Sequence, residues 1–166
     1  MKLFLLLLVA VTPASESGFS DDILLTHRLM SLSAKYRERP SYKNVLQLVK
    51  VAKHLEQTCL PNILIAEDYL AMAWVESRFN PRAVGKAGEH GAWQVLEWKH
   101  YLKRTGGVDS FNIETNGQMV CAELREKYKW HKTYQKTITS YNGLSPRGRI
   151  YFKRVTVIRK QIVSSS

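Results

Sequence analysis

The sequence predicts a single, mostly α-helical domain, and three observations support this prediction. The chain has 166 residues, of which 45% are hydrophobic, enough for one buried core. Apolar residues recur every three or four positions in most segments, which is the spacing of a helix with one buried face. Pro40, Pro61 and Pro81 separate these segments, as expected at the ends of helices.

The first residues are typical of an export signal. Lys2 is followed by an uncharged, leucine-rich run, residues 3–11, and then by small residues. This run is shorter than the stretch of about 20 residues that spans a bilayer. We expect a signal peptide, residues 1–17, cleaved between Ala14 and Ser17, and a protein exported to the periplasm or cell envelope. An uncleaved membrane anchor or a buried first helix is the alternative.

Two helices are expected in the N-terminal segment, residues 18–58. The pattern predicts them over 21–36 and 42–56. The first should end before Pro40, because proline disfavours the helical conformation in the residue that precedes it. Ser41 can cap the second helix with its hydroxyl group.

The third expected helix, residues 62–77, carries the strongest candidate for a catalytic residue. The helix is apolar on almost every face, which is typical of a helix inside a domain. Steps of four and three back from Glu76 reach Met72 and Tyr69, so this acid ends an apolar stripe. Apolar surroundings favour a neutral carboxyl, the state that a general acid needs near neutral pH. Alternatively, Glu76 leans into solvent or pairs with a basic side chain.

Four short motifs follow one another from this helix onward. They are, in order, Glu76-Ser77 with Phe79, Pro81 and Ala83; Gly88 with Gly91 and Gln94; Asn112-Ile113 with Gly117; and Ser140-Tyr141-Asn142-Gly143 before Tyr151 to Val155. In this order and spacing they resemble the soluble (Slt-type) catalytic domain of lytic transglycosylases, relatives of goose-type lysozyme. The resemblance implies a lysozyme-like helical domain with a saccharide-binding cleft, residues 59–160, followed by a C-terminal tail, residues 161–166.

The resemblance implies that Glu76 acts as both acid and base of a peptidoglycan lytic transglycosylase. Glu76 would protonate the glycosidic oxygen between N-acetylmuramic acid (MurNAc) and N-acetylglucosamine (GlcNAc). The acetamido group of the substrate would do the work of a nucleophile. The ionised Glu76 would then take a proton from the primary hydroxyl of MurNAc, which closes onto the anomeric carbon and leaves an anhydro-muramoyl end.

The resemblance also implies substrate-binding roles for Ser77, Gln94, Tyr141, Asn142, Trp93 and Phe79. The hydroxyls of Ser77 and Tyr141 could hydrogen-bond the catalytic carboxyl or the acetamido group. The amides of Gln94 and Asn142 could pair with sugar amides. Trp93 and Phe79 could stack on sugar faces. The alternatives are structural: a Ser77 hydroxyl bonded to its own helix, and core positions for the aromatic residues.

The chain departs from the family pattern in the loop after the third helix. Gly85 stands where the family usually has Ser, and Glu89 where it usually has Ala. Ala92-Trp93 replaces a common Leu-Met pair. We expect these changes to reshape the saccharide groove rather than abolish it.

A second acid would change the expected reaction from ring closure to hydrolysis, because the two-carboxylate mechanism activates a water across the cleft. No second acid has a claim comparable to that of Glu76. Asp68, Glu67 and Glu97 are expected to be solvated or salt-bridged surface acids. A lysozyme-type hydrolase is the alternative if Glu89 or Glu97 faces Glu76 with room for a water.

The net charge of +11 favours an anionic partner such as peptidoglycan, whose stem peptides carry carboxylates. Basic residues from Arg147 to Lys160 alternate with Tyr151 and Phe152, which leaves a non-catalytic wall- or nucleic-acid-binding module as a further alternative. Export argues against nucleic acid. The five histidines lack zinc-binding spacing, so we expect no metal and no cofactor. Small exported members of the family suggest a monomer that serves a secretion, conjugation or phage apparatus.

Cys59 and Cys121 could form a disulfide in an oxidising compartment, or remain two separate buried thiols. Neither belongs to a Cys-x-x-Cys motif. The family architecture would bring the start of the Glu76 helix near the helix that begins at Asn112-Ile113, and so implies that the two cysteines can pair.

Overall fold

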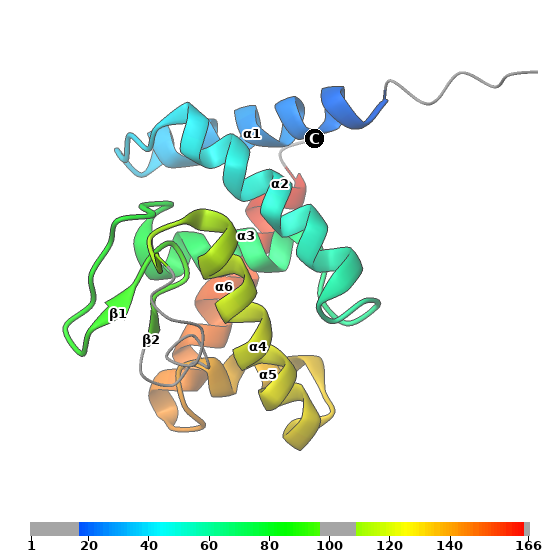
Figure 1. Ribbon diagram of the computed structural model, residues 1–166, viewed down its shortest axis with the longest axis vertical. Coiled ribbons are helices and arrows are strands. Elements are labelled where there is room, and N and C mark those ends of the chain that lie inside the picture. The colour runs from blue at the N-terminus through cyan, green and yellow to red at the C-terminus, as the bar shows by residue number, and fades with distance from the viewer. Residues whose placement is uncertain (1–16, 97–108, 165–166) are drawn as a thin grey trace, which may run out of the picture.

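The computed structural model describes residues 17–96 and 109–164, which form six helices and one short hairpin of two strands (Figure 1). In chain order the elements are α1 (Ser17–Lys35), α2 (Tyr42–Thr58), α3 (Ala66–Ser77), β1 (Glu89–His90), β2 (Val95–Leu96), α4 (Ile113–His131), α5 (Tyr134–Tyr141) and α6 (Pro146–Ser164). The predicted mostly α fold is confirmed. The expected signal peptide lies, except for its last residue, outside the described residues. No helix within these two ranges is long and apolar enough to cross a membrane.

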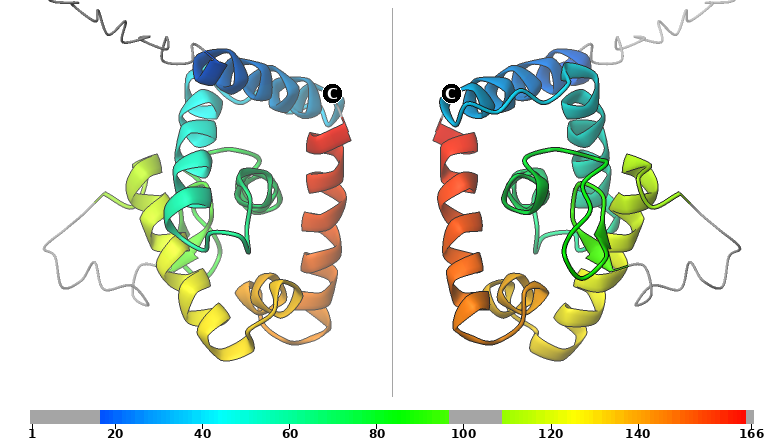
Figure 2. Two further views of the ribbon diagram at one scale, coloured as in Figure 1. Left: turned by 90° about the vertical axis from the view of Figure 1, so that its right-hand side faces the viewer. Right: turned by 90° about the vertical axis from the view of Figure 1, so that its left-hand side faces the viewer.

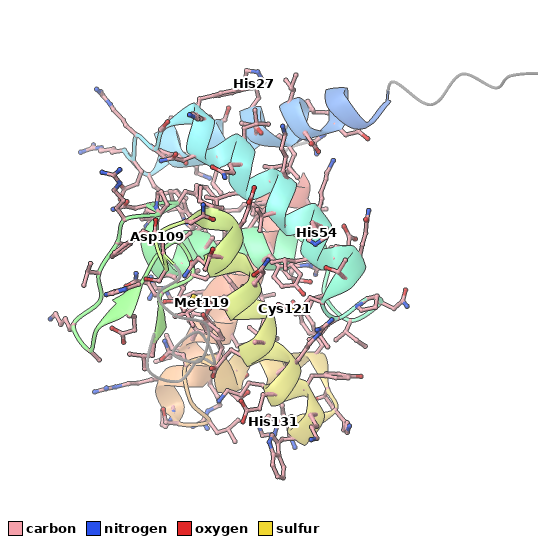
Figure 3. The ribbon with its side chains drawn as sticks, in the orientation of Figure 1. His27, His54, Asp109, Met119, Cys121 and His131 are labelled. Carbon is pink, nitrogen blue, oxygen red and sulfur yellow. A yellow bond between two sulfur atoms is a disulfide. The ribbon has the colours of Figure 1, made fainter. Side chains whose placement is uncertain are left out.

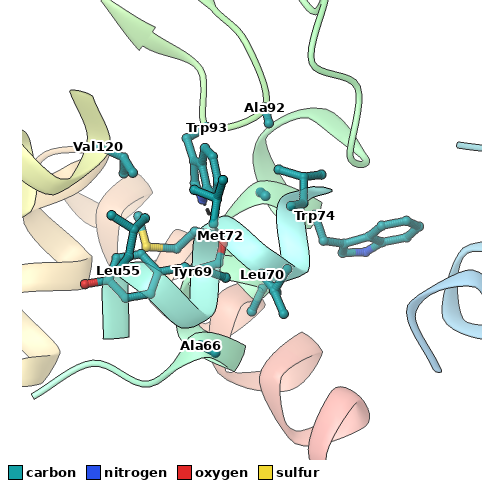
Figure 4. Packing of buried hydrophobic residues seen from close by; sticks show 14 of the residues in the cluster. Leu55, Ala66, Tyr69, Leu70, Met72, Trp74, Ala92, Trp93 and Val120 are labelled. Carbon is teal, nitrogen blue, oxygen red and sulfur yellow. Dashed lines mark hydrogen bonds between the residues drawn. The ribbon is translucent and has the colours of Figure 1, made fainter. Parts of the chain in front are cut away.

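The buried α3 is the centre of the molecule. Figure 2 shows it almost end-on, with the other helices around it, and α2 and α6 pack directly against it. Eight of its 12 residues are buried, which explains why its sequence is apolar on almost every face. Side chains of α3 such as Tyr69, Leu70 and Met72 point in different directions to reach different neighbours (Figure 4). The predicted central helix is therefore confirmed.

The two N-terminal helices belong to the same core as the rest of the chain. Leu29 of α1 and Leu48 of α2 are fully buried in one hydrophobic cluster with the residues of α3. The boundaries of both helices differ slightly from those predicted, since α1 begins at Ser17 and α2 continues to Thr58. Ser41 does occupy the N-cap of α2, but its side chain makes no capping hydrogen bond.

Two other boundaries correct the sequence prediction. The third helix begins at Ala66 instead of residue 62, because Asn62 adopts a left-handed conformation in a turn after Pro61. At the other end of the chain, residues 161–164 belong to α6 and are no tail. Ile162 is buried on the same face of α6 as Val155 and Ile158. The buried face of the helix therefore extends beyond Val155, where the family motif ends.

Asp68 is a buried acid, which corrects its expected place on the surface. Its carboxylate lies 3.0 Å from the Arg159 side chain, accepts a hydrogen bond of 2.8 Å from the Tyr134 hydroxyl, and caps α3 by accepting one from the Ile65 backbone N–H. Burial raises the pKa of Asp68, and these partners act in the opposite direction. The network joins α3 to α5 and α6, so its role is structural. Glu67, the neighbouring acid, is half-buried.

Cys59 and Cys121 form a disulfide, which settles the pairing that the sequence left open. The bond ties the end of α2 to the middle of α4, where Figure 3 labels Cys121. Arg125 reinforces the same junction by donating a hydrogen bond of 2.9 Å to the Cys59 carbonyl.

Replacing both Cys59 and Cys121 by Ser should lower the free energy of unfolding. The chain-entropy account gives about 4 kcal/mol for a bond between residues 62 positions apart. Urea denaturation of the variant and the wild type, both without reductant, measures this difference. Two free thiols in the denatured, unreduced wild-type protein would contradict the disulfide.

Candidate active site

Glu76 lies at the point where α3 ends and the chain turns sharply. The helix finishes at Ser77, and the next two residues, Arg78 and Phe79, both have positive φ values, of 58° and 64°. Arg78 is the C-cap of α3: its backbone N–H donates to the Trp74 carbonyl, and its guanidinium lies over the Trp74 ring, 4.8 Å from the centroid. The turn directs the following loop back past the end of α3, beside the Glu76 side chain.

A cleft of about 230 Å³ opens beside Glu76. Its walls come from the end of α3, the loop and hairpin between residues 85 and 96, α4, and the end of α5. The residues lining it are Glu76, Gly85, Lys86, Glu89, Gln94, Val95, Leu96, Glu123, Tyr141 and Asn142. The cleft thus combines three carboxylates with amide and hydroxyl groups, a composition that suits a polar ligand such as a sugar.

The surroundings of Glu76 raise its pKa to about 7. Burial of the carboxyl is the main cause, and the nearby negative charge of Glu89 adds to it. The Tyr151 hydroxyl and the Arg154 guanidinium act in the opposite direction. The Tyr151 hydroxyl itself is buried and forms no hydrogen bond of ordinary geometry within the described residues. Glu76 is therefore close to half protonated at neutral pH, as a group that both gives and takes a proton requires.

Asn116 of α4 holds the loop that forms one wall of the cleft. Its side-chain oxygen accepts a hydrogen bond of 2.9 Å from the Trp93 backbone N–H, and its side-chain nitrogen donates one of 3.0 Å to the His90 carbonyl. Gly91 lies between these two contacts, and a Cβ there would come within 2.5 Å of the Asn116 side chain. Asn116 is fully buried. Its side chain supplies the turn with backbone hydrogen bonds that a neighbouring strand would otherwise provide.

Three further hydrogen bonds attach the same turn to α3 and α5. The Ser77 hydroxyl donates to the Ala92 carbonyl at 2.8 Å, and the Trp93 indole donates to the Tyr69 carbonyl at 2.8 Å. The Tyr141 hydroxyl donates to the Trp93 carbonyl at 2.7 Å. The wall of the cleft is consequently tied to the helix that carries the acid.

The structure brings only some of the expected substrate-binding residues to the cleft. Gln94, Tyr141 and Asn142 line it together with Glu76. The Tyr141 hydroxyl donates its hydrogen bond to the Trp93 carbonyl of the loop. The amide nitrogen of Gln94 donates to the carbonyls of Ala83 and Gly91 at 3.1 Å and 2.9 Å. Asn142 is exposed at the end of α5.

Ser77, Trp93 and Phe79 lie behind the cleft wall instead of lining it. The Ser77 hydroxyl bonds to the Ala73 and Ala92 carbonyls. Trp93 and Phe79 are fully buried, so neither ring is available to stack on a sugar. The structural alternatives considered for these three residues describe their positions correctly.

Sequence reasoning missed several residues of the site. Glu89, considered only as the second acid of a possible hydrolase, lines the cleft with Glu76, while Glu97 lies outside the described residues. Glu123 of α4 belongs to none of the four motifs, and Tyr151 belongs to a motif that gives it no role in the site. Asn116 gave a usable signal, since it is a polar residue on the apolar face of α4, the same pattern that singled out Glu76.

Within the two described ranges, histidine, cysteine and carboxylate side chains form no group of three or more that could hold a metal ion. His27, His54 and His131 lie on α1, α2 and α4, well separated in Figure 3.

Replacing Asn116 by Ala should destabilise the protein by about 3 kcal/mol, because it removes one hydrogen bond from each of two backbone groups in the turn, those of Trp93 and His90. Replacing it by Asp should also be destabilising, since a carboxylate oxygen would face the His90 carbonyl. Urea denaturation measures both effects. Gln118→Ala, an exposed position two residues along α4, is the matched control and should change the stability by less than about 0.5 kcal/mol. An Asn116→Ala variant as stable as this control would refute the proposed tether.

The geometry of this cleft agrees with an independent comparison of the sequence with known families. The family model described as "Transglycosylase SLT domain" matches residues 63–155, more than half of the chain. Comparison with curated proteins and with solved structures gives no significant match. The matched region begins before α3 and ends within α6, so it contains every described wall of the cleft. The chain belongs to the transglycosylase SLT domain family, as a single lysozyme-like helical domain.

Proposed function

We propose that this protein is a peptidoglycan lytic transglycosylase that cleaves the MurNAc–GlcNAc bond and leaves an anhydro-muramoyl end. Membership of the SLT family supports a glycan-degrading activity on peptidoglycan. The observation that carries the finer proposal is the half-buried Glu76 carboxyl, whose pKa of about 7 fits a group that alternates between acid and base in a polar cleft.

The first step is protonation of the leaving oxygen. The protonated Glu76 donates to the glycosidic oxygen as the bond to the MurNAc anomeric carbon breaks through an oxocarbenium-like state. The acetamido carbonyl of the substrate bonds transiently to that carbon. Burial and the Glu89 charge favour the protonated Glu76 that this step consumes.

The second step is ring closure. Glu76 is now a carboxylate, which the Arg154 guanidinium and the Tyr151 hydroxyl stabilise. It takes the proton of the MurNAc primary hydroxyl, whose oxygen bonds to the anomeric carbon and displaces the acetamido oxygen. No water is consumed, and the enzyme returns to its protonated state.

Gln94 and Asn142 are the groups best placed to orient the sugar amides. The Gln94 amide nitrogen donates a hydrogen bond to the Ala83 carbonyl of the loop. The amide oxygen points toward Gly85 in the cleft and can accept a hydrogen bond from an acetamido N–H. The exposed Asn142 amide can both donate and accept. Tyr141 holds the wall in place through its bond to the Trp93 carbonyl.

The proposed setting is the cell envelope. Export fits the expected signal peptide, and the Cys59–Cys121 disulfide fits an oxidising compartment. The net charge of +11 suits a wall polymer rich in carboxylates. A monomer that opens the wall for a secretion, conjugation or phage apparatus remains our proposal for its biological role.

Replacing Glu76 by Gln should abolish digestion of purified sacculi, since Gln keeps the shape of the side chain and removes the proton that is transferred. We expect a loss of at least about 100-fold in rate, the lower end for a general acid–base. Mass spectrometry of the wild-type digest should show muropeptides with anhydro ends, lighter by one water than reducing-end products.

Glu126→Gln, which removes an exposed acid of α4 outside the cleft, serves as the control and should digest sacculi at the wild-type rate. Circular dichroism verifies that both variants fold. A folded Glu76→Gln variant that digests sacculi normally would show that Glu76 is not the acid.

A further inference from the structure

Glu89 is a carboxylate of the cleft that takes no proton and gives none in the proposed mechanism. It begins β1 and lines the same cleft as Glu76. One oxygen of its carboxylate accepts a hydrogen bond of 3.0 Å from the Ala87 backbone N–H. Its carbonyl accepts another, of 2.7 Å, from the Gly85 N–H. The backbone of the loop therefore holds this carboxylate in the cleft.

Gly85 provides the space that the Glu89 carboxylate occupies. A Cβ at position 85 would lie 2.1 Å from an oxygen of that carboxylate and 2.8 Å from the side-chain oxygen of Gln94. The serine usual in the family at this position could not coexist with Glu89 as it is placed here. A side chain at position 85 would therefore displace the Glu89 carboxylate, and its present place in the cleft depends on Gly85.

We propose that Glu89 is a second catalytic residue, which gives this protein a hydrolytic reaction in addition to ring closure. The inference rests on the proposed function, because Glu76 remains the proton donor to the leaving oxygen. In the added reaction Glu89 takes a proton from a water molecule. The water oxygen bonds to the MurNAc anomeric carbon while the bond from that carbon to the GlcNAc oxygen breaks. The product is a reducing end, and one water is consumed.

The charges around Glu76 are compatible with this division of roles. The groups that act on the Glu76 carboxyl are Tyr151 and Arg154 of α6 and Glu89 of β1, and Tyr141 of α5 lies close enough to be affected by it. Among these, Glu89 supplies the second negative charge. When one carboxylate raises the pKa of another, the pair readily divides into an acid and a base.

Digestion of sacculi in water enriched in oxygen-18 tests the proposal. The fragments are reduced at once with borohydride and analysed by mass spectrometry. Wild-type enzyme should give anhydro ends without label and reducing ends with one labelled oxygen. Glu89→Gln should lower the labelled product about 100-fold, the lower end for loss of a general base, and leave the anhydro ends.

Gly85→Ser is a second variant, which keeps Glu89 but pushes its carboxylate out of place. Position 85 does not have a positive φ, so the backbone accepts a side chain there. We expect this variant to lose the labelled product in the same way. The double variant Gly85→Ser, Glu89→Ala restores the family pattern and should give anhydro ends alone, even if a single variant folds poorly. Glu126→Gln is the control and should keep the wild-type ratio of products.

The product types separate this proposal from the proposed function. Wild-type enzyme that forms anhydro ends alone would overturn the role of Glu89 and leave that of Glu76 intact. An unchanged labelled fraction in folded Glu89→Gln would do the same. Absence of both products from the wild-type digest would overturn both proposals.

Discussion

The cleft depends on the hydrogen bonds that tie one turn, residues 90–93, to three helices. Asn116 of α4 pairs with backbone groups on both sides of Gly91, while Ser77 of α3 and Tyr141 of α5 each donate to a carbonyl of the turn. A turn of this kind has too little strand pairing to satisfy its own backbone, and unpaired buried groups are costly. The tethers therefore fix the wall of the cleft relative to the end of α3, where Glu76 lies.

The chemistry of the site comes from opposing influences on one carboxyl group. Burial and Glu89 favour the protonated form of Glu76, whereas Tyr151 and Arg154 favour the ionised form. The first pair of influences outweighs the second and raises the pKa of Glu76 to about 7, so the same group can donate a proton early in the reaction and accept one later. The fold produces this balance by bringing α3, the hairpin and α6 together. Local sequence around Glu76 supplies only the apolar stripe.

Properties set by local sequence were predictable, and those set by long-range packing were not. The buried third helix and its terminal acid follow from periodicity. The helix start at Asn112 was implied by the family resemblance, and the Asn112 side chain caps it by accepting two backbone hydrogen bonds. Asp68 looked like a surface acid because Tyr134 and Arg159, its partners, lie more than 60 positions away. The expected sugar-stacking role of Trp93 failed for the same reason, since only the folded chain shows that the Tyr69 carbonyl holds its ring in the core.

The pKa of Glu76 in the free enzyme tests the account most directly. Protein labelled with carbon-13 at glutamate carboxyls can be titrated by NMR, with the Glu76→Gln variant identifying the signal. Because burial disfavours the charged form, the account predicts that this one carboxyl titrates near pH 7, so that it is protonated below that pH and ionised above it. A signal that titrates near the ordinary value of 4.5 would mean that Glu76 is ionised at neutral pH, and would contradict its role as the proton donor.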